Sequence, residues 1–179
     1  LLNQGVNSMS DKLVVKAKKI KLIATDIDGV WTDSKMYYTP DGVFMKSFST
    51  YDGMGADLLI KNNFIVSMIT SEYENIEILL ARAKKLNIKE VYTNEKNKLK
   101  RINYLAEKYN LTSENIAYIG DDINDLEALQ FAGLSASPPK APILDFFQPD
   151  FVTSRKSGMG AFRDLAELIM KAQKIDIVF

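Results

Sequence analysis

Residues 20–29 read Ile-Lys-Leu-Ile-Ala-Thr-Asp-Ile-Asp-Gly, a short apolar run that ends in two carboxylates and a glycine. Two later stretches have the same design. Residues 64–70 are apolar and end in the hydroxyl of a threonine, and residues 116–121 end in Gly-Asp. Short apolar runs bounded by turn residues are typical of strands buried on both faces. The three runs therefore predict strands of one parallel sheet.

Amphipathic helices are predicted between these strands. Apolar residues recur with a 3.6-residue period over residues 99–109 and again over residues 162–169. Ser71 and Glu74 have the spacing of a capping box, which predicts that a helix begins directly after the second strand. Strands that alternate with helices indicate an α/β fold with a Rossmann-like parallel sheet and helices on both of its faces.

Residues 36–48 interrupt the alternation. They contain a Pro-Asp-Gly turn at positions 40–42 between two strand-like runs, which predicts a projecting β-hairpin. The hairpin and one helix fill the chain between the first and second strands, so no cap domain is expected. Without repeats or linkers, residues 11–179 are predicted to form a single domain, and residues 1–10 to be flexible or foreign to the natural protein.

The composition excludes several classes of function. The 179 residues carry 23 Lys+Arg and 23 Asp+Glu, which argues against a nucleic-acid or membrane-surface binder. No apolar run reaches the ~20 residues of a membrane helix. The sequence has no Cys and no His, so it offers neither a thiolate nucleophile nor an imidazole ligand. Any metal must accept oxygen ligands, as Mg²⁺ and Ca²⁺ do. We expect a cytoplasmic protein.

The ends of the three predicted strands carry the candidate chemistry. Ligands of open parallel sheets bind beyond the carboxyl ends of the strands, where Asp26, Asp28, Thr70 and residues 120–125 are expected to meet. Each feature alone has an ordinary explanation, because Asp, Thr and Ser often cap helices. Together they place several carboxylates at one edge, and a divalent cation would relieve their repulsion.

Four motifs resemble those of the haloacid dehalogenase-like phosphatases. Residues 26–30 (Asp-Ile-Asp-Gly-Val) resemble the first motif, Thr70 the second, Lys98 the third and residues 120–125 (Gly-Asp-Asp-Ile-Asn-Asp) the fourth. The stretches Asp-Gly-Val-Trp-Thr-Asp, ending at position 33, and Lys-Ser-Gly-Met-Gly-Ala-Phe-Arg, ending at position 163, are similar to a capless branch. That branch dephosphorylates 3-deoxy-2-ulosonate sugar acids such as octulosonate 8-phosphate and nonulosonate 9-phosphates.

The resemblance implies roles for the residues of the first and fourth motifs. Asp26 would be the nucleophile that forms an aspartyl-phosphate, and Asp28 the general acid and base. Mg²⁺ would be held by the Asp26 carboxylate, the Asp28 main-chain carbonyl and Asp121. Asn124 and Asp125 would position Lys98 or metal-bound water. Asp122 would contact the metal ligands without binding the metal itself.

The remaining roles concern the phosphate and the substrate. Thr70 and Ser71, with backbone N–H groups at a helix N-terminus, would hold phosphate oxygens. Lys98 would neutralise the nucleophile and the transferring phosphoryl group. Its ordinary alternative is a solvated lysine, because basic residues cluster around it.

Several positions bear on the choice of sugar acid. Ser71-Glu72 stands where octulosonate phosphatases usually have Gly-Arg, and Glu72, Trp31 and Lys85 look more like the nonulosonate branch. Tyr51 replaces an arginine that is common in the octulosonate enzymes. Arg155 and Arg163 are candidate binders of a carboxylate or phosphate, in their own site or in that of a neighbouring subunit. Ordinary surface charge explains these two arginines equally well.

A homo-oligomer is expected, because a partner subunit would shield an uncapped site and cover the apolar hairpin. The resemblance implies a tetramer.

Two other functions stay open. One is a phospho-Asp receiver, which would need no acid two residues after its nucleophile. The other is a catalytically idle assembly domain, like the phosphatase-like domain of some sialic-acid cytidylyltransferases, against which the intact motifs argue.

Overall fold

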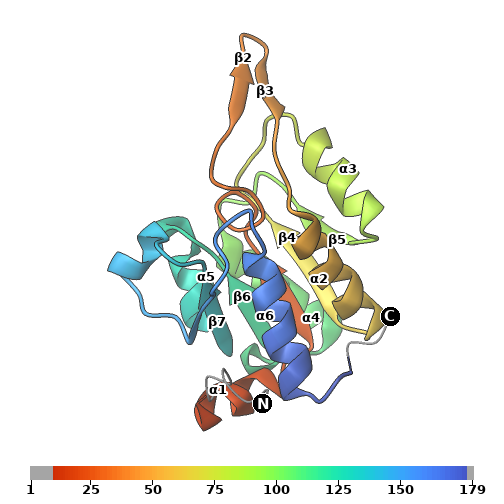
Figure 1. Cartoon of the computed structure of the whole chain (residues 1–179), viewed down its shortest axis with the longest axis vertical. Coiled ribbons are helices and arrows are strands. Elements are labelled where there is room, and N and C mark those ends of the chain that lie inside the picture. Colours follow the sequence, from red (N-terminus) through yellow and green to blue (C-terminus); the bar gives the residue numbers. More distant parts are fainter. Residues whose placement is uncertain (1–9, 177–179) are drawn as a thin grey trace, which may run out of the picture.

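A six-stranded parallel sheet in the order β5–β4–β1–β6–β7–β8 forms the centre of the computed structural model, which describes residues 10–176 (Figure 1). Its strands are β1 (Leu22–Thr25), β4 (Ile65–Ile69), β5 (Glu90–Tyr92), β6 (Ile116–Ile119), β7 (Leu134–Ser137) and β8 (Phe151–Val152). The predicted N-terminal segment, residues 1–10, lies outside the described residues except for Ser10. The Ser10 hydroxyl accepts a hydrogen bond from the N–H of Leu13 and caps the first helix.

The three predicted strands are confirmed as β1, β4 and β6, with β1 between the other two. Leu22 pairs with Ile65 on one side and with Ile116 on the other. Side chains along β1 alternate between two hydrophobic clusters, since Ile23 packs in one cluster and Leu22 and Ala24 in the other. Burial on both faces explains why these strands are mostly apolar, with Thr25 and Ser67 as buried polar exceptions.

Helices cover both faces of the sheet, as predicted. One layer contributes to the cluster around Ile23 and contains α1 (Asp11–Ala17), α2 (Thr50–Lys61), α3 (Glu77–Lys85) and α6 (Ala161–Ala172). The opposite layer contains α4 (Lys98–Tyr109) and α5 (Leu126–Phe131). Three short 3₁₀ helices complete the fold: η1 (Ser113–Asn115), η2 (Ile123–Asp125) and η3 (Pro142–Asp145). Helices α4 and α6 match the two predicted amphipathic segments.

The predicted hairpin is also confirmed. Strands β2 (Tyr37–Thr39) and β3 (Gly42–Met45) pair antiparallel and project from the body of the molecule at the top of Figure 1. Gly42 has φ of +108°, a conformation that glycine adopts at little cost. Among residues 10–176, no helix is long and apolar enough to cross a membrane.

The predicted helix start at Ser71 is wrong, because α3 begins only at Glu77. The Glu72 carboxylate accepts hydrogen bonds from the N–H groups of Tyr73 and Glu74, so it stabilises a turn that competes with a helix. Asn75 then has φ of +44°, which lies in the left-handed region and is incompatible with a right-handed helix. Residues 71–76 therefore form a loop after β4.

Candidate active site

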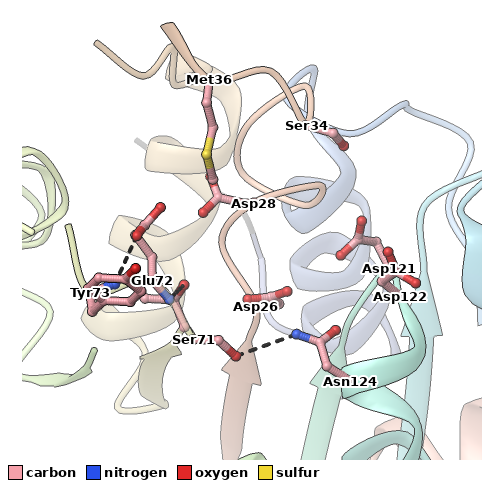
Figure 2. A pocket seen from close by; sticks show the side chains of 11 residues that line it. Asp26, Asp28, Ser34, Met36, Ser71, Glu72, Tyr73, Asp121, Asp122 and Asn124 are labelled. Atoms are coloured by element: carbon pink, nitrogen blue, oxygen red, sulfur yellow. Dashed lines mark hydrogen bonds between the residues drawn. The ribbon is translucent and has the colours of Figure 1, made fainter. Parts of the chain in front are cut away.

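An open cleft lies at the carboxyl edge of the sheet, where the loops after β1, β4 and β6 meet (Figure 2). The strand order reverses here, because the chain passes from β5 on one side of β1 to β6 on the other. The cleft has a volume of about 410 Å³. It is lined by Asp26, Asp28, Ser34, Met36, Thr70, Ser71, Glu72, Tyr73, Asp121, Asp122 and Asn124. Most of the predicted site residues thus come together.

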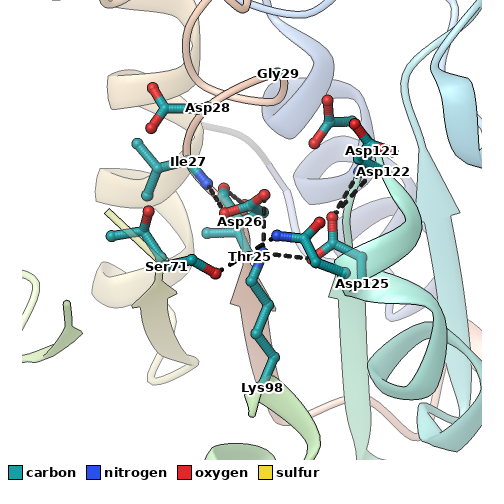
Figure 3. A network of polar contacts seen from close by, with 12 residues as sticks. Thr25, Asp26, Ile27, Asp28, Gly29, Ser71, Lys98, Asp121, Asp122 and Asp125 are labelled. Atoms are coloured by element: carbon teal, nitrogen blue, oxygen red, sulfur yellow. Dashed lines mark hydrogen bonds and ion pairs between the residues drawn. The ribbon is translucent and has the colours of Figure 1, made fainter. Parts of the chain in front are cut away.

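Asp26 lies at the floor of the cleft, directly after β1. Its Oδ1 accepts a hydrogen bond of 2.7 Å from the N–H of Ile27, and its Oδ2 lies 2.9 Å from the Nζ of Lys98 (Figure 3). Burial and the negative charge of Asp125 raise the pKa of Asp26 well above its usual value, although Lys98 acts in the opposite direction. The carboxylate is therefore fixed in place, and further positive charge would stabilise its ionised form.

Lys98 is buried beneath Asp26 and is held there by Asp125. The Oδ1 of Asp125 lies 2.6 Å from the Nζ of Lys98 and also accepts a hydrogen bond from the Tyr118 hydroxyl. The Oδ2 of Asp125 accepts hydrogen bonds from the N–H groups of Asp121 (2.9 Å) and Asp122 (3.3 Å). Both oxygens of Asp125 are occupied, so this residue positions Lys98 and closes the loop after β6.

Two glycines allow close packing around Asp121 and Asp125. Gly29 has φ of +87°, and a Cβ atom there would lie 1.8 Å from the Oδ2 of Asp121. A Cβ atom on Gly120 would lie 2.4 Å from the Cγ of Asp125. A larger residue at Gly29 would push the loops after β1 and β6 apart, and a larger residue at Gly120 would displace Asp125 within the loop after β6. Both glycines are therefore requirements of the site geometry.

The acidic residues of the cleft fit a divalent cation. Carboxylate oxygens of Asp26, Asp121 and Asp125 lie within 4.8 Å of one another. Among residues 10–176, Lys98 alone forms ion pairs with members of this trio. Burial and the charge of Asp125 raise the pKa of Asp121 to about 7. Since Asp125 is already occupied by four donors, Asp26 and Asp121 are the carboxylates left to bind a cation. Oxygen ligands of this kind suit Mg²⁺.

Asp28 lies on the opposite side of the cleft from Asp121 (Figure 2). Its Oδ1 accepts a hydrogen bond of 3.3 Å from the Thr32 hydroxyl, and its Oδ2 lies 2.7 Å from the Nζ of Lys46. No motif or spacing in the sequence points to Lys46, nor to Ser34 or Tyr73 in the cleft lining. Ser34 and Tyr73 line the cleft, and Lys46 contacts Asp28, because of the path of the segment that carries the hairpin and of the loop after β4.

Thr70 and Ser71 follow β4 on the third side of the cleft. The Thr70 hydroxyl accepts a hydrogen bond of 3.1 Å from the N–H of Glu72. The Asn124 side-chain amide lies 3.5 Å from the Ser71 hydroxyl and links this loop to the loop after β6. Because α3 begins at Glu77, the predicted helix N-terminus for phosphate binding is wrong, and any phosphate contacts must come from the loop itself.

Four residues considered for the substrate do not line the cleft. Lys85 is exposed at the C-terminal end of α3, and Tyr51 is exposed at the start of α2. Arg155 forms ion pairs with Asp164 (2.6 Å) and Glu167 (3.7 Å), and Arg163 pairs with Glu167 (2.6 Å). Within one copy of the chain these residues therefore lie outside the cleft lining, and a role for them in substrate binding stays a prediction. Contact of Arg155 or Arg163 with a neighbouring subunit's site stays a prediction.

Comparison with known proteins agrees with this geometry. A family model described as haloacid dehalogenase-like hydrolase matches residues 45–137. The chain is 33% identical over 169 residues to the 3-deoxy-D-manno-octulosonate 8-phosphate phosphatase of Salmonella typhi, which is 94% of this chain and 89% of that protein. The chain belongs to the haloacid dehalogenase-like hydrolases. It is a phosphatase of that family.

Solved structures of two relatives share the fold of this haloacid dehalogenase-like hydrolase. The octulosonate 8-phosphate phosphatase of Moraxella catarrhalis, in complex with magnesium ion, phosphate ion and a KDO molecule, matches with a TM-score of 0.87 and 34% identity, over 92% of this chain and 94% of that one. The cobalt-bound enzyme of Haemophilus influenzae matches with a TM-score of 0.83 and 34% identity, over 89% and 92% of the two chains.

Proposed function

We propose that this phosphatase uses Mg²⁺ to hydrolyse the phosphate monoester of a 3-deoxy-2-ulosonate sugar acid through an aspartyl-phosphate. The observation that carries the proposal is the placement of Asp26 at the floor of an open cleft, between the Lys98 ammonium (2.9 Å) and a group of carboxylates with too few positive partners. A buried carboxylate held in this way is oriented for attack on an electrophile that enters from the cleft.

In the first step an oxygen of Asp26 attacks phosphorus, and the bond from phosphorus to the sugar oxygen breaks. Asp28 donates a proton to the departing oxygen. In the second step Asp28 removes a proton from water, which attacks phosphorus and releases inorganic phosphate and free Asp26. Lys98 stabilises the charge on Asp26 and on the transferring group, and Asp125 keeps Lys98 in position.

Mg²⁺ would be bound by the carboxylates of Asp26 and Asp121 and by the main-chain carbonyl of Asp28, with Asp122 behind them. When bound, it neutralises phosphate charge and favours in-line attack. On the other side of the cleft, Thr70 and Ser71 would hold phosphate oxygens, and Asn124 would keep the Ser71 hydroxyl in place (3.5 Å).

The sugar part of the substrate would contact the open side of the cleft, where Glu72 and Tyr73 lie. The relatives named octulosonate 8-phosphate phosphatases favour octulosonate 8-phosphate. Glu72 favours a nonulosonate 9-phosphate, because it can accept hydrogen bonds from additional hydroxyls of a longer sugar. Trp31 is fully buried against Phe162, with ring centroids 4.6 Å apart, and therefore acts on the substrate only through the fold.

A phosphate-release screen tests this proposal. Octulosonate 8-phosphate and several nonulosonate 9-phosphates are compared with simple alkyl phosphates at equal Mg²⁺ concentration. The proposal expects kcat/KM for one sugar-acid ester to exceed that for simple alkyl phosphates by at least about 10-fold, or about 1.4 kcal/mol of transition-state binding. A chain that hydrolyses simple phosphates and discriminates against every sugar-acid ester would contradict the substrate class.

We further propose that the enzyme is a cytoplasmic homo-oligomer, in the form of a tetramer. Exposed apolar side chains on the hairpin, including Tyr38 (61%) and Phe44 (55%), support association, because apolar patches of this kind mark contact surfaces. Light scattering after size-exclusion chromatography would measure the mass of the assembly. A monomer at micromolar concentration would contradict this part of the proposal.

A further inference from the structure

Lys46 is the first residue after β3, and its side chain runs from the base of the hairpin into the protein. The side chain is only 5% exposed, which is unusual for a lysine outside the catalytic network around Lys98. Its ammonium lies 2.7 Å from the Oδ2 of Asp28 and 3.6 Å from an oxygen of Glu72. A buried ammonium needs such partners, and here one of the two is the proposed general acid.

The carboxylate of Asp28 is held at both oxygens. The Thr32 hydroxyl donates to Oδ1 at 3.3 Å, a weak contact within the same loop, while Lys46 provides the short contact to Oδ2. Asp28 keeps 21% of its side chain exposed, toward the cleft. Removal of the Lys46 ammonium would leave only the weaker Thr32 contact to fix the direction of this carboxyl group.

Glu72 holds Lys46 from the other side. One Glu72 oxygen accepts hydrogen bonds from the N–H groups of Tyr73 (2.9 Å) and Glu74 (3.0 Å), and its other oxygen faces Lys46. Burial opposes ionisation of Glu72, but these N–H groups and Lys46 outweigh it and lower the pKa of the carboxyl group. Since Glu72 is anchored to the loop after β4, Lys46 links the base of the hairpin to that loop.

The base of the hairpin is attached to the same loop at a second point. The Asn75 side-chain amide donates to the main-chain carbonyl of Val43, which is buried in β3. Beside Lys46, a cavity lined by Ile27, Thr70, Glu72 and Asn75 leaves about 10 Å³ of free space. This volume is at the lower limit for one water molecule, so the side chain of Lys46 is closely packed where it approaches Asp28 and Glu72.

We propose that Lys46 is a positioning residue that orients the Asp28 carboxyl group toward the leaving-group oxygen. Because Lys46 lies at the base of the hairpin, proton donation by Asp28 then depends on the position of the hairpin. The inference rests on the proposed function, in which Asp28 is the proton donor. Lys46 does not touch the phosphate in this account. Its loss should therefore impair only reactions whose leaving group needs a proton.

Substrates with different leaving groups separate this role from a role in binding. A sugar or alkyl phosphate releases a poor leaving group that needs the proton of Asp28, whereas p-nitrophenyl phosphate releases a stable phenolate that does not. The ratio kcat/KM includes only the steps up to departure of the leaving group, so it is insensitive to the later attack of water on the aspartyl-phosphate.

The test compares Lys46→Met with wild type on glycerol 1-phosphate and on p-nitrophenyl phosphate, both in saturating Mg²⁺. General acid catalysis contributes about 10²–10⁴-fold, and partial misplacement of the acid should cost about 10–100-fold in kcat/KM for glycerol 1-phosphate. We expect less than about a 3-fold loss for p-nitrophenyl phosphate. Lys46→Arg should recover part of the loss. Lys61→Met is the matched control, because Lys61 forms an ion pair of the same 2.7 Å length with Asp57 on the exposed surface of α2.

Equal losses on both substrates would overturn the inference and assign Lys46 to binding of the phosphate. An active, folded Lys46→Met variant with wild-type kcat/KM on both substrates would overturn it as well. If Lys46→Met does not fold, as judged by circular dichroism, the same comparison with Lys46→Gln decides the question. A wild-type protein that releases no phosphate from any ester would instead overturn the proposed function, and this assignment with it.

Discussion

Two clusters of charged side chains, each built on a buried carboxylate, lie at opposite ends of the sheet and differ in how their negative charge is compensated. At the amino end of β5, Glu90 accepts hydrogen bonds from Lys108 (2.6 Å) and from the hydroxyls of Tyr92 and Tyr109. Burial opposes ionisation of Glu90, but these three donors outweigh it and lower its pKa. At the carboxyl edge, burial and mutual repulsion raise the pKa values of Asp26 and Asp121, despite Lys98.

The difference shows what separates a structural cluster from a functional one. Both clusters contain one lysine and at least one buried carboxylate, but Lys98 is buried whereas Lys108 is partly exposed. Glu90 is one carboxylate with three donors, so its ionised form is satisfied by the fold alone. Asp26, Asp121 and Asp125 are three carboxylates that share one ammonium. This group needs a further cation from solution, and buried groups of this kind mark functional sites.

The largest expected effect is on catalysis, at the cluster of Asp26, Asp121 and Asp125. Asp26→Asn should lower kcat for phosphate release by at least about 10⁴-fold, because the amide is not a nucleophile. The melting temperature without added metal should stay the same or rise, since one of the repelling charges is removed. Asp57→Asn, on the surface of α2, is the control. Wild-type turnover by Asp26→Asn would end the assignment of the nucleophile.

The next largest effect is on the free energy of unfolding, where Lys98 and Lys108 should contribute unequally. Lys98→Met should destabilise the fold by about 3 kcal/mol, because it leaves Asp26 and Asp125 buried without a positive partner. Lys108→Met should cost clearly less, since Glu90 keeps the two tyrosine hydroxyls and Lys108 is partly exposed. Urea unfolding of both variants measures the difference. Equal losses would show that the two clusters do not differ in the way proposed.

The dependence of stability on pH should also separate the clusters. The folded-state pKa of Asp121 is about 7, above its usual value, so the folded chain binds a proton that the unfolded chain has released. In EDTA, the free energy of unfolding should therefore fall as pH rises from about 6 to about 8. Asp52 titrates near pH 6, at the lower limit of this range, and Glu90, whose pKa is lowered, titrates below it.

Saturating Mg²⁺ should abolish most of that fall, because the bound cation favours ionised Asp26 and Asp121. It should also raise the melting temperature at pH 8, since it binds only the folded state. Differential scanning calorimetry at the two pH values, with EDTA or Mg²⁺, gives the four measurements. A fall in stability that is the same with and without Mg²⁺ would mean that the cation does not bind at these carboxylates.

The smallest effect on activity is expected at the cluster around Glu90. Glu90→Gln should leave kcat/KM unchanged, because Glu90 lies at the opposite end of the sheet from the cleft. It should destabilise the fold by about 1–2 kcal/mol through loss of charge-assisted hydrogen bonds. Phosphate release and urea unfolding measure the two quantities. A large loss of activity in a folded Glu90→Gln variant would connect the clusters and contradict their separation.

The sequence predicted the central part of the fold because the central strands are mostly apolar. Strands β1, β4 and β6 are buried on both faces and carry a clear signal. Strands β5, β7 and β8 are two to four residues long, and β5 and β7 contain polar residues such as Glu90, Ser135 and Ser137. Nothing in their pattern distinguishes them from loops. The capping-box spacing at Ser71 was misleading because the Glu72 carboxylate forms a local turn instead.

For the candidate site, the strand ends were predictable and the approach of other segments was not. Asp26, Thr70 and Asp121 follow buried strands, so the topology alone brings them together. Lys46 reaches Asp28 through the path of the hairpin, which no periodicity encodes. Arg155 and Arg163 resembled substrate ligands by sequence, but each has acidic partners on α6. The geometry that pairs these charges appears only in the folded chain.

Chemical trapping of the phosphorylated residue tests the central claim most directly. The wild-type enzyme is mixed with substrate and Mg²⁺, quenched within one turnover and reduced with borohydride, which converts an aspartyl-phosphate to homoserine. Peptide mass spectrometry then locates the modified residue. The account predicts modification at Asp26 and at no other carboxylate, and none in Asp26→Asn. Modification at another carboxylate, such as Asp28 or Asp121, would contradict it.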